Sequence, residues 1–227
     1  MQKLFYLLFD DETADGVALR AAIRNSAVPV MRASGATGII VFANDDDVAK
    51  GRCVRLHDPP IRAAVSFWLE DAADRQASED ALRALVPDLS GYLVLESRPM
   101  VHDRPRGDRT PGMKQITCIR RRSDIDQDEF IRIWHGDHRT VAIETQSTFG
   151  YVRNEIIRTL TPGSAEAWSA IVEESFPIEA LTDPMVFFDA RTPEEHQAHV
   201  KRMVESCARF LDMDRIEVTF VSEYDLG

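Results

Sequence analysis

The stretch Glu129–His138, which reads EFIRIWHGDH, is the part of the sequence on which the fold prediction rests. Phe130, Trp134 and His138 recur at positions i, i+4 and i+8, so they share one face of a helix. Asp126 lies three residues before Glu129, a spacing typical of a helix N-terminus. The stretch therefore predicts an amphipathic helix whose apolar face ends in a histidine.

His138 is the first candidate for a functional group. Histidine changes its charge near neutral pH, which suits it to proton transfer. The alternative is a histidine at the edge of the core, with one nitrogen bonded and no further role.

The order of motifs around this helix resembles that of the EthD family. A strand-like segment, Lys114–Arg121, precedes the helix, and GYVRN at 150–154 follows it. The sequence ARFLD at 208–212 and then Glu223 are similar to the end of that family's sequences. The resemblance covers residues 114–226 and implies a dimeric α+β barrel, an α+β fold built from two ferredoxin-like units.

Function follows less directly from this resemblance. The family is named for a protein needed in ether breakdown, and the same barrel fold carries cofactor-free cyclases, lactone isomerases, monooxygenases and haem enzymes. An inference from the fold to an activity is analogy alone.

Composition narrows the class of protein. The chain has 227 residues, a net charge of −11, 44% hydrophobic residues and three cysteines. The negative charge argues against a nucleic-acid partner, and no apolar run approaches the roughly 20 residues of a membrane span. Few, unpaired cysteines favour a reducing cytoplasm, and a homodimer is compatible with the sequence.

The strand and helix order of the first half is repeated in the second. We expect strands at 4–9, 38–42, 63–69 and 92–96 with helices at 15–34 and 78–85, the β-α-β-β-α-β order of a ferredoxin-like unit. The second series has strands at 115–121, 150–154, 170–176 and 215–222 and a long helix at 193–211. The predicted units are 1–101 and 114–227, joined by a linker at 102–113.

An offset of 111 residues (114 − 3) relates Lys3 to Lys114 and aligns the two halves. At that offset Ala27 stands where the second half has His138. We expect the two halves to close one barrel within the chain, with the polar site in the second half alone.

Strand alternation predicts which side chains enter a central cavity of that barrel. We assign Gln115, Thr117, Ile119 and Arg121 to the cavity and Ile116 and Cys118 to the helices. In the first half, Leu4, Tyr6 and Leu8 take the equivalent cavity face.

Glu173 falls where the EthD family has a glutamate. A buried carboxylate there would have a raised pKa and would act as an acid or orient His138; an exposed glutamate at a strand end is the alternative. Tyr151 and Asn154 both match the family pattern, but regular pleating sends them to opposite faces. Tyr151 is preferred, because its phenol can donate to an oxyanion.

The remaining candidates are substrate contacts. Trp134 and Tyr6 are expected on the cavity wall, and Arg121 is expected to bind a substrate carboxylate unless it is solvated. His57, in a loop, could complete the cavity from the first half, whereas His135 is expected to face solvent. No metal site or cofactor motif is present in the sequence.

The sequence predicts a cofactor-independent lyase, isomerase or cyclase that acts by acid–base chemistry on a small aromatic or polyketide-like carbonyl compound. His138, Tyr151 and Glu173 are its expected catalytic residues. The alternative is a non-catalytic accessory or small-molecule-binding protein of a degradation pathway. An enzyme should have an enclosed pocket, and an accessory protein a filled barrel with an exposed apolar patch.

Overall fold

Eight antiparallel strands close into one barrel in the computed structural model, which describes residues 1–161 and 168–227. Their order around the barrel is β1-β3-β2-β8-β5-β7-β6-β4. The strands are β1 Gln2–Phe9, β2 Thr37–Ala43, β3 Ile61–Leu69, β4 Asp88–Met100, β5 Met113–Arg121, β6 Gly150–Thr159, β7 Ala170–Phe176 and β8 Leu211–Asp225. The expected closed barrel within one chain is confirmed, and β4, β6 and β8 are longer than predicted.

The first four strands form one arc of this barrel and the last four form the other. Their orders, β4-β1-β3-β2 and β8-β5-β7-β6, place corresponding strands in the same succession. The arcs meet along β2–β8 and β4–β6, where Val41 is opposite Tyr224 and Leu95 is opposite Glu155.

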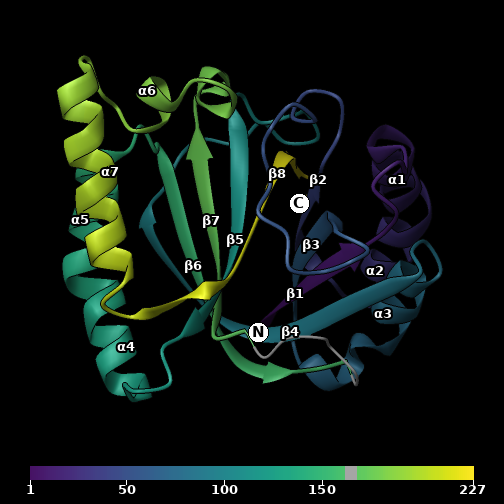
Figure 1. Cartoon of the computed structure of the whole chain (residues 1–227). Helices are drawn as coiled ribbons and strands as arrows, with labels where there is room; N and C mark the ends of the chain where they lie inside the picture. The colour runs from purple at the N-terminus through teal and green to yellow at the C-terminus, as the bar shows by residue number, and fades with distance from the viewer. Residues whose placement is uncertain (162–167) are drawn as a thin grey trace.

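Helices cover the outside of each arc (Figure 1). Those on the first arc are α1 Gly16–Ala22, α2 Val28–Ala33 and α3 Gln76–Arg83, and those on the second are α4 Gln127–Ile133, α5 Arg139–Thr145 and α7 Pro193–Cys207. Short helical turns lie at η2 Ala72–Arg75, η4 Ile178–Leu181 and α6 Pro184–Phe187. None of these three turns had been predicted.

The helix predicted from the stretch at 129–138 is present and begins where expected. The Asp126 carboxylate accepts a hydrogen bond from the Glu129 backbone N–H at 2.8 Å, which caps the N-terminus. Its middle turn, η3 Trp134–His138, is π-helical. The first half has a π-helical turn at η1 Ile23–Ala27, again 111 residues earlier (134 − 23).

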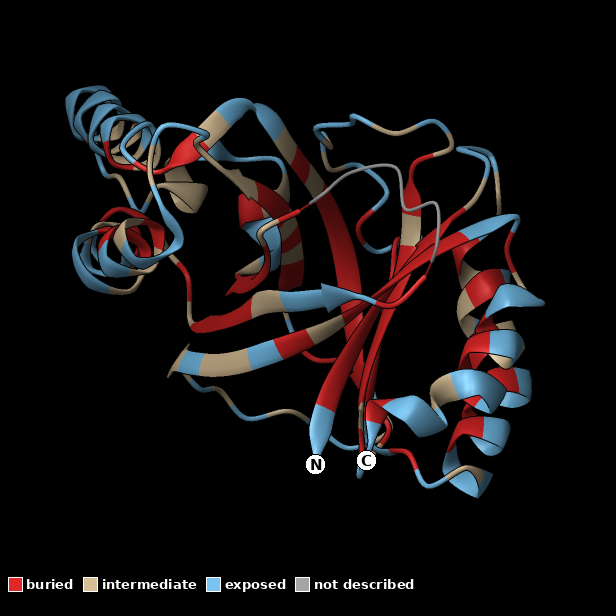
Figure 2. Ribbon diagram, turned by 90° about the horizontal axis from the view of Figure 1, so that it is seen from below, coloured by how far each residue is buried: buried red, intermediate tan, exposed pale blue. Residues whose placement is uncertain are grey.

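The barrel interior holds a packed apolar core beside a buried polar group of Lys3, Asn154 and Glu173. Phe5, Leu7 and Phe9 of β1 pack there with Ile116 and Cys118 of β5. Figure 2 shows the strands buried through the middle of the molecule and the helices buried on one side. The described residues therefore fill the interior, and the expected central cavity is not formed there.

The predicted strand faces were consequently wrong. Gln115, Thr117 and Ile119 lie on the side that α4, α5 and α7 cover, and Tyr6 packs beneath the helices of the first arc. Alternation gives the period of a strand, but it does not say which face the helices cover. Leu4, Tyr6 and Leu8 were predicted to be equivalent to Gln115, Thr117 and Ile119 at the 111-residue offset. Both sets lie on the helix-covered side of their arcs, which is consistent with that prediction.

Candidate functional site

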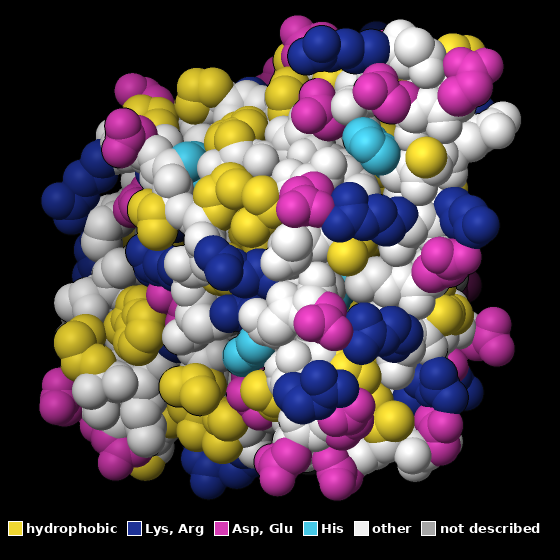
Figure 3. All heavy atoms as spheres, turned by 90° about the vertical axis from the view of Figure 1, so that its left-hand side faces the viewer, with side chains coloured by type: hydrophobic (Ala, Val, Ile, Leu, Met, Phe, Trp, Pro, Cys, Tyr) yellow, Lys and Arg dark blue, Asp and Glu magenta, His cyan; other side chains and the backbone are white. Residues whose placement is uncertain are grey.

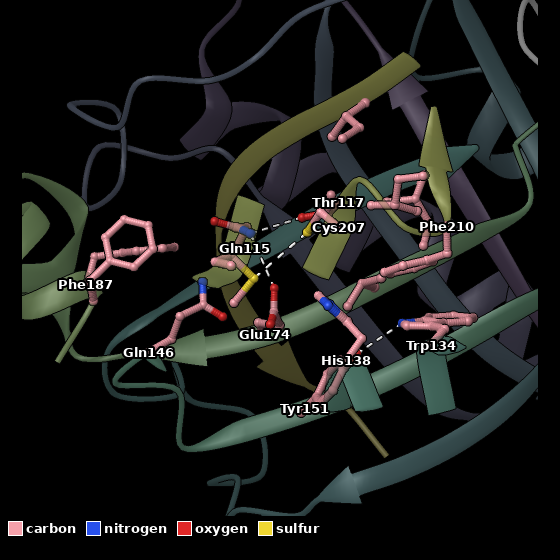
Figure 4. A pocket seen from close by; sticks show the side chains of 16 residues that line it. Gln115, Thr117, Trp134, His138, Gln146, Tyr151, Glu174, Phe187, Cys207 and Phe210 are labelled. Carbon is pink, nitrogen blue, oxygen red and sulfur yellow. Dashed lines mark hydrogen bonds between the residues drawn. The ribbon is translucent and has the colours of Figure 1, made fainter. Parts of the chain in front are cut away.

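A cavity of about 230 Å³ lies between the outer face of β5–β8 and the helices that cover it. Its wall includes Gln115, Thr117, Trp134, His138, Tyr151 and Glu174. Figure 4 shows these side chains converging from strands and helices on one space. An apolar cavity of about 150 Å³ is enough for benzene, so this one suits a molecule of one or two rings.

Aromatic side chains form one end of this pocket. The indole N–H of Trp134 donates to the Tyr151 hydroxyl oxygen at 3.0 Å, and both residues are buried. The Phe210 ring lies 4.7 Å from the His138 ring. Because the Tyr151 oxygen accepts from Trp134, its own proton remains available to a ligand.

His138 stands in the π-helical turn and faces the pocket, with 8% of its surface exposed. Its Nδ1 lies 3.0 Å from the hydroxyl oxygen of Ser206 on α7. Burial, with a smaller contribution from the charge of Arg209, lowers the pKa of His138 to about 4. At neutral pH this histidine is therefore an uncharged donor and acceptor.

Glu174 is the carboxyl group of the pocket, and sequence reasoning had chosen its neighbour Glu173. Gln115 donates from Nε2 to its Oε2 at 3.3 Å, and the residue is 8% exposed. Burial raises the pKa of Glu174 to about 7, although the positive charge of Lys114 opposes the rise. A carboxyl group that is half-ionised near neutral pH can take and return a proton.

Glu173 and Asn154 lie on the other side of the sheet, inside the barrel. The carboxylate of Glu173 accepts from Asn154 Nδ2 at 2.9 Å and pairs with Lys3 Nζ at 3.3 Å. The prediction that Glu173 orients His138 is therefore wrong, and Asn154, the other residue that matched the family pattern, does not line the pocket. The preference for Tyr151 in the pocket agrees with its position, because regular pleating separates it from Asn154.

The other predicted substrate contacts also lie elsewhere. Tyr6 donates to Glu79 Oε2 at 3.0 Å beneath the first-arc helices, and His57 pairs with Glu217 beside the barrel core residue Phe9. Arg121 donates to the backbone oxygen of Arg122 at the end of β5. Of the predicted substrate contacts, Trp134 alone lines the described pocket.

His135 differs from its prediction as well. It is half-buried rather than solvated, and its Nε2 is buried without a hydrogen-bond partner among the described residues. Burial, together with the charge of Arg153, lowers the pKa of His135 to about 4. Its ring packs 5.0 Å from that of Trp134, behind the pocket wall.

Side-chain size explains why the matching space in the first half is occupied. At the 111-residue offset, Tyr6 stands for Thr117, Leu4 for Gln115 and Ala27 for His138. The Tyr6 ring is fully buried and stacks on Phe67 at 5.7 Å, within the apolar cluster under the helices. The smaller Thr117 leaves open in the second half the volume that a tyrosine ring fills in the first.

A second, more open hollow of about 670 Å³ adjoins the pocket at Phe187, which lines both. Its other walls include Lys50 and Arg52 from a first-half loop, and Leu181 and Phe220. The half-buried Phe187 ring stacks on Phe176 at 4.5 Å. The turn that carries Phe187 had no prediction, because four-residue helices leave no periodic pattern.

Within residues 1–161 and 168–227, no three His, Cys, Asp or Glu side chains come together as a metal-binding group. The helices in the same part of the chain are all too short or too polar to cross a membrane. Figure 3 shows the helix-covered face of the second arc, where hydrophobic side chains form separate groups among charged ones.

No family model matches the chain, and neither does any curated protein. Among solved structures, an anthrone oxidase-like protein aligns with a TM-score of 0.59 at 10% identity, over 100% of this chain and 94% of its own. A mutant chlorite dismutase from Candidatus Nitrospira defluvii, in complex with cyanide, aligns with a TM-score of 0.52 at 9% identity, over 99% and 91%. A dye-decolorizing peroxidase from Bacteroides thetaiotaomicron gives 0.51 at 8%, over 99% and 93%.

The fold is that of the dimeric α+β barrel proteins. At such low identity the likeness extends to the fold alone. These comparisons do not name the EthD family, so that resemblance stays a prediction.

Proposed function

We propose that this chain is an enzyme that takes a small aromatic or polyketide-like carbonyl compound into the Glu174 pocket and removes a proton beside the carbonyl. The observation that carries the proposal is Glu174, a carboxyl group on the pocket wall with a pKa of about 7. General bases work best when their pKa lies near the operating pH. One fold neighbour is an anthrone oxidase-like protein. Anthrone is a ring ketone, which agrees with a ring ketone as the proposed ligand of this pocket.

Ionised Glu174 would take the proton from carbon, leaving an enolate whose oxygen needs donors. Tyr151 can supply one, because Trp134 already occupies an acceptor site on its oxygen and orients the phenol. His138 can supply another from Nε2 if Nδ1 accepts from Ser206, since the neutral ring has one N–H. The proton carrier is then Glu174 rather than the predicted His138, whose low pKa makes it a weak base.

An enolate is an early intermediate of several reactions. Protonation at another atom gives isomerisation, expulsion of a leaving group gives a lyase reaction, and attack on a second carbonyl gives cyclisation. The predicted lyase, isomerase or cyclase activity fits this pocket, and cofactor independence remains part of the proposal.

A haem fits the pocket poorly. His138 could present Nε2, but the cavity of about 230 Å³ falls below the roughly 300–1,000 Å³ of sites for drug-sized ligands. Purified protein is therefore expected to show no Soret band.

We also infer that the chain is a duplicated ferredoxin-like unit, with residues 1–101 and 114–227 as the two copies and 102–113 as the linker. The repeated strand succession and the π-helical turns at the 111-residue offset support this inference. A cytoplasmic location and a homodimer stay predictions.

The test needs no knowledge of the natural substrate. With 2-tetralone in D₂O, the wild-type protein should speed the exchange of the hydrogens beside the carbonyl, followed by proton NMR. Glu174→Gln should lower that rate by about 10²–10⁴-fold, because the amide cannot accept the proton as a carboxylate does. Glu205→Gln, an exposed site on α7, is the matched control.

Binding of 2-tetralone without faster exchange would contradict the enzyme proposal. The non-catalytic binding protein would then be the better account. Exchange that persists in a folded Glu174→Gln variant would remove Glu174 from the mechanism.

A further inference from the structure

Gln146 is a buried amide in the pocket that has no bonding partner among the described residues. It follows α5, is 8% exposed, and lines the cavity. Figure 4 shows its carboxamide directed into the pocket, on the side toward Phe187. No hydrogen bond joins its carboxamide to another described residue, and its oxygen and nitrogen are not among the fully buried atoms without a partner, so they are open to the space of the pocket.

The other pocket glutamine provides a contrast. Gln115 donates from Nε2 to Thr117 Oγ1 at 3.0 Å and to Glu174 Oε2 at 3.3 Å. Protein groups therefore satisfy that amide nitrogen, and its role in the pocket is to hold Glu174. Gln146 offers a carbonyl acceptor and two N–H donors to whatever enters the cavity.

An unpaired amide in a buried position costs folding free energy, so buried polar groups nearly always have partners. Water can occupy the position in an empty pocket. A ligand oxygen that replaced such a water would bond to the amide, and a ligand without that oxygen would leave it unpaired.

We infer that Gln146 is a specificity-determining residue that binds a second oxygen substituent, a hydroxyl or a carbonyl, of an aromatic substrate. The inference rests on the proposed function, in which Glu174 removes the proton beside the first carbonyl and Tyr151 donates to its oxygen. The substrate class is therefore a one- or two-ring compound with at least two oxygen functions. A site built to bond a substrate hydroxyl discriminates strongly against analogues that lack it.

The apolar wall near Gln146 strengthens this discrimination. Phe187 and Phe188 line the same cavity and bring no polar side-chain atom to it. Gln146 lies on the same side of the pocket as Phe187 in Figure 4, and its carboxamide can bond to a hydroxyl placed there. Substituting this one side chain should therefore remove the preference.

The test compares naphthol with the isomeric dihydroxynaphthalenes, titrated against the full-length protein and followed by fluorescence. We expect at least one dihydroxy isomer to bind wild type about 5-fold or more tightly than naphthol does, because it adds one hydrogen bond to a buried amide. Gln146→Met, of equal length and without polar atoms, should bring that isomer to the affinity of naphthol. Gln197→Met, exposed on α7, should leave both affinities unchanged.

The outcomes separate this inference from the proposed function. If wild type binds naphthol but no dihydroxy isomer more tightly, or if folded Gln146→Met keeps the preference, the role of Gln146 is overturned and the pocket proposal stands. If wild type binds no ring compound at all, the proposed function itself is wrong. The wild-type comparison decides the matter even if the variant does not fold.

Discussion

At the scale of single residues, two adjacent glutamates of β7 have different environments, and this difference determines which of them can serve the proposed chemistry. Glu173 meets Lys3 and Asn154 inside the barrel, whereas Glu174 faces the pocket with Gln115 as its neutral partner. Burial raises the pKa of Glu174, and the charge of Lys114 offsets only part of that rise. Glu174 is consequently the group that can exchange a proton near neutral pH.

Stability should depend on pH through Glu174. Its pKa is about 7 in the folded protein and 4.5 ordinarily, so the folded state holds a proton that the unfolded chain releases between these values. The stabilising contribution is full below pH 4.5 and is lost as pH rises through 7, by about 3 kcal/mol.

Urea denaturation from pH 4.5 to 8 measures this effect. Relative to Glu174→Gln, wild type should lose about 3 kcal/mol over the interval. Glu205→Gln, an exposed control, should track wild type throughout. A constant difference between wild type and Glu174→Gln would mean that Glu174 titrates as an ordinary carboxyl group.

Sequence reasoning reached the right strand but selected the glutamate that faces the barrel interior instead of the one that lines the pocket. The strand predicted at 170–176 contained both residues. The sequence pattern did not show which face of β7 the helices cover. Both sides of the strand are buried, with Ile171 and Glu173 on one and Val172 and Glu174 on the other. When both faces of a strand are covered, polarity no longer marks the outside.

At the scale of elements, the π-helical turn Trp134–His138 places the pocket residues. A π-turn holds one more residue than an α-turn, so it rotates the residues after it relative to a regular helix. Trp134 and His138 both line the cavity from this turn. The periodic pattern of the sequence predicted the helix but could not reveal the extra residue.

Deletion of Gly136 should convert the turn to a regular helix. Gly136 is exposed, and nothing lies within 4 Å of the position of an added Cβ. We expect the shortened protein to stay folded and to bind naphthol within about 3-fold of wild type, because four residues of α-helix turn through nearly the same angle as the five residues of the π-turn and leave His138 facing the pocket.

Gly136→Ala is the control for this deletion. It should keep naphthol binding and gain up to about 1 kcal/mol of stability from the lower helix cost of alanine. Naphthol affinity by fluorescence and unfolding by circular dichroism measure both effects. A loss of affinity of about 10-fold or more in the deletion variant would contradict this expectation and show that the geometry of the π-turn itself is needed for binding.

At the scale of the whole molecule, two similar arcs differ in what lies beneath their helices. The closed barrel and the difference between Ala27 and His138 could be predicted from the sequence, through the repeated order of strands and helices, the family resemblance and the 111-residue offset. The location of the candidate site was not predicted, because the cavity was expected inside the barrel and the pocket lies between the sheet and its helices. The sequence feature that could have indicated the pocket is the difference between Tyr6 and Thr117 at equivalent positions, because the second half lacks an aromatic ring on the helix-facing side.

Thr117→Tyr should restore in the second half the filling seen in the first. We expect the tyrosine ring to occupy the cavity of about 230 Å³, keep the thermal midpoint at or above that of wild type, and abolish naphthol binding. Thr159→Tyr, at an exposed site on β6, should bind naphthol as wild type does. Naphthol bound with wild-type affinity by folded Thr117→Tyr would place the binding site elsewhere.

The protonation of Glu174 is the quantity on which the proposed chemistry depends most directly. Carbon-13 NMR of protein labelled at glutamate carboxyl carbons, titrated from pH 4 to 9, measures it, and Glu174→Gln identifies the resonance by its loss. The account predicts that this resonance titrates with a midpoint near 7 instead of the ordinary 4.5 of a glutamate. A Glu174 resonance that titrates together with the exposed glutamates would contradict the account.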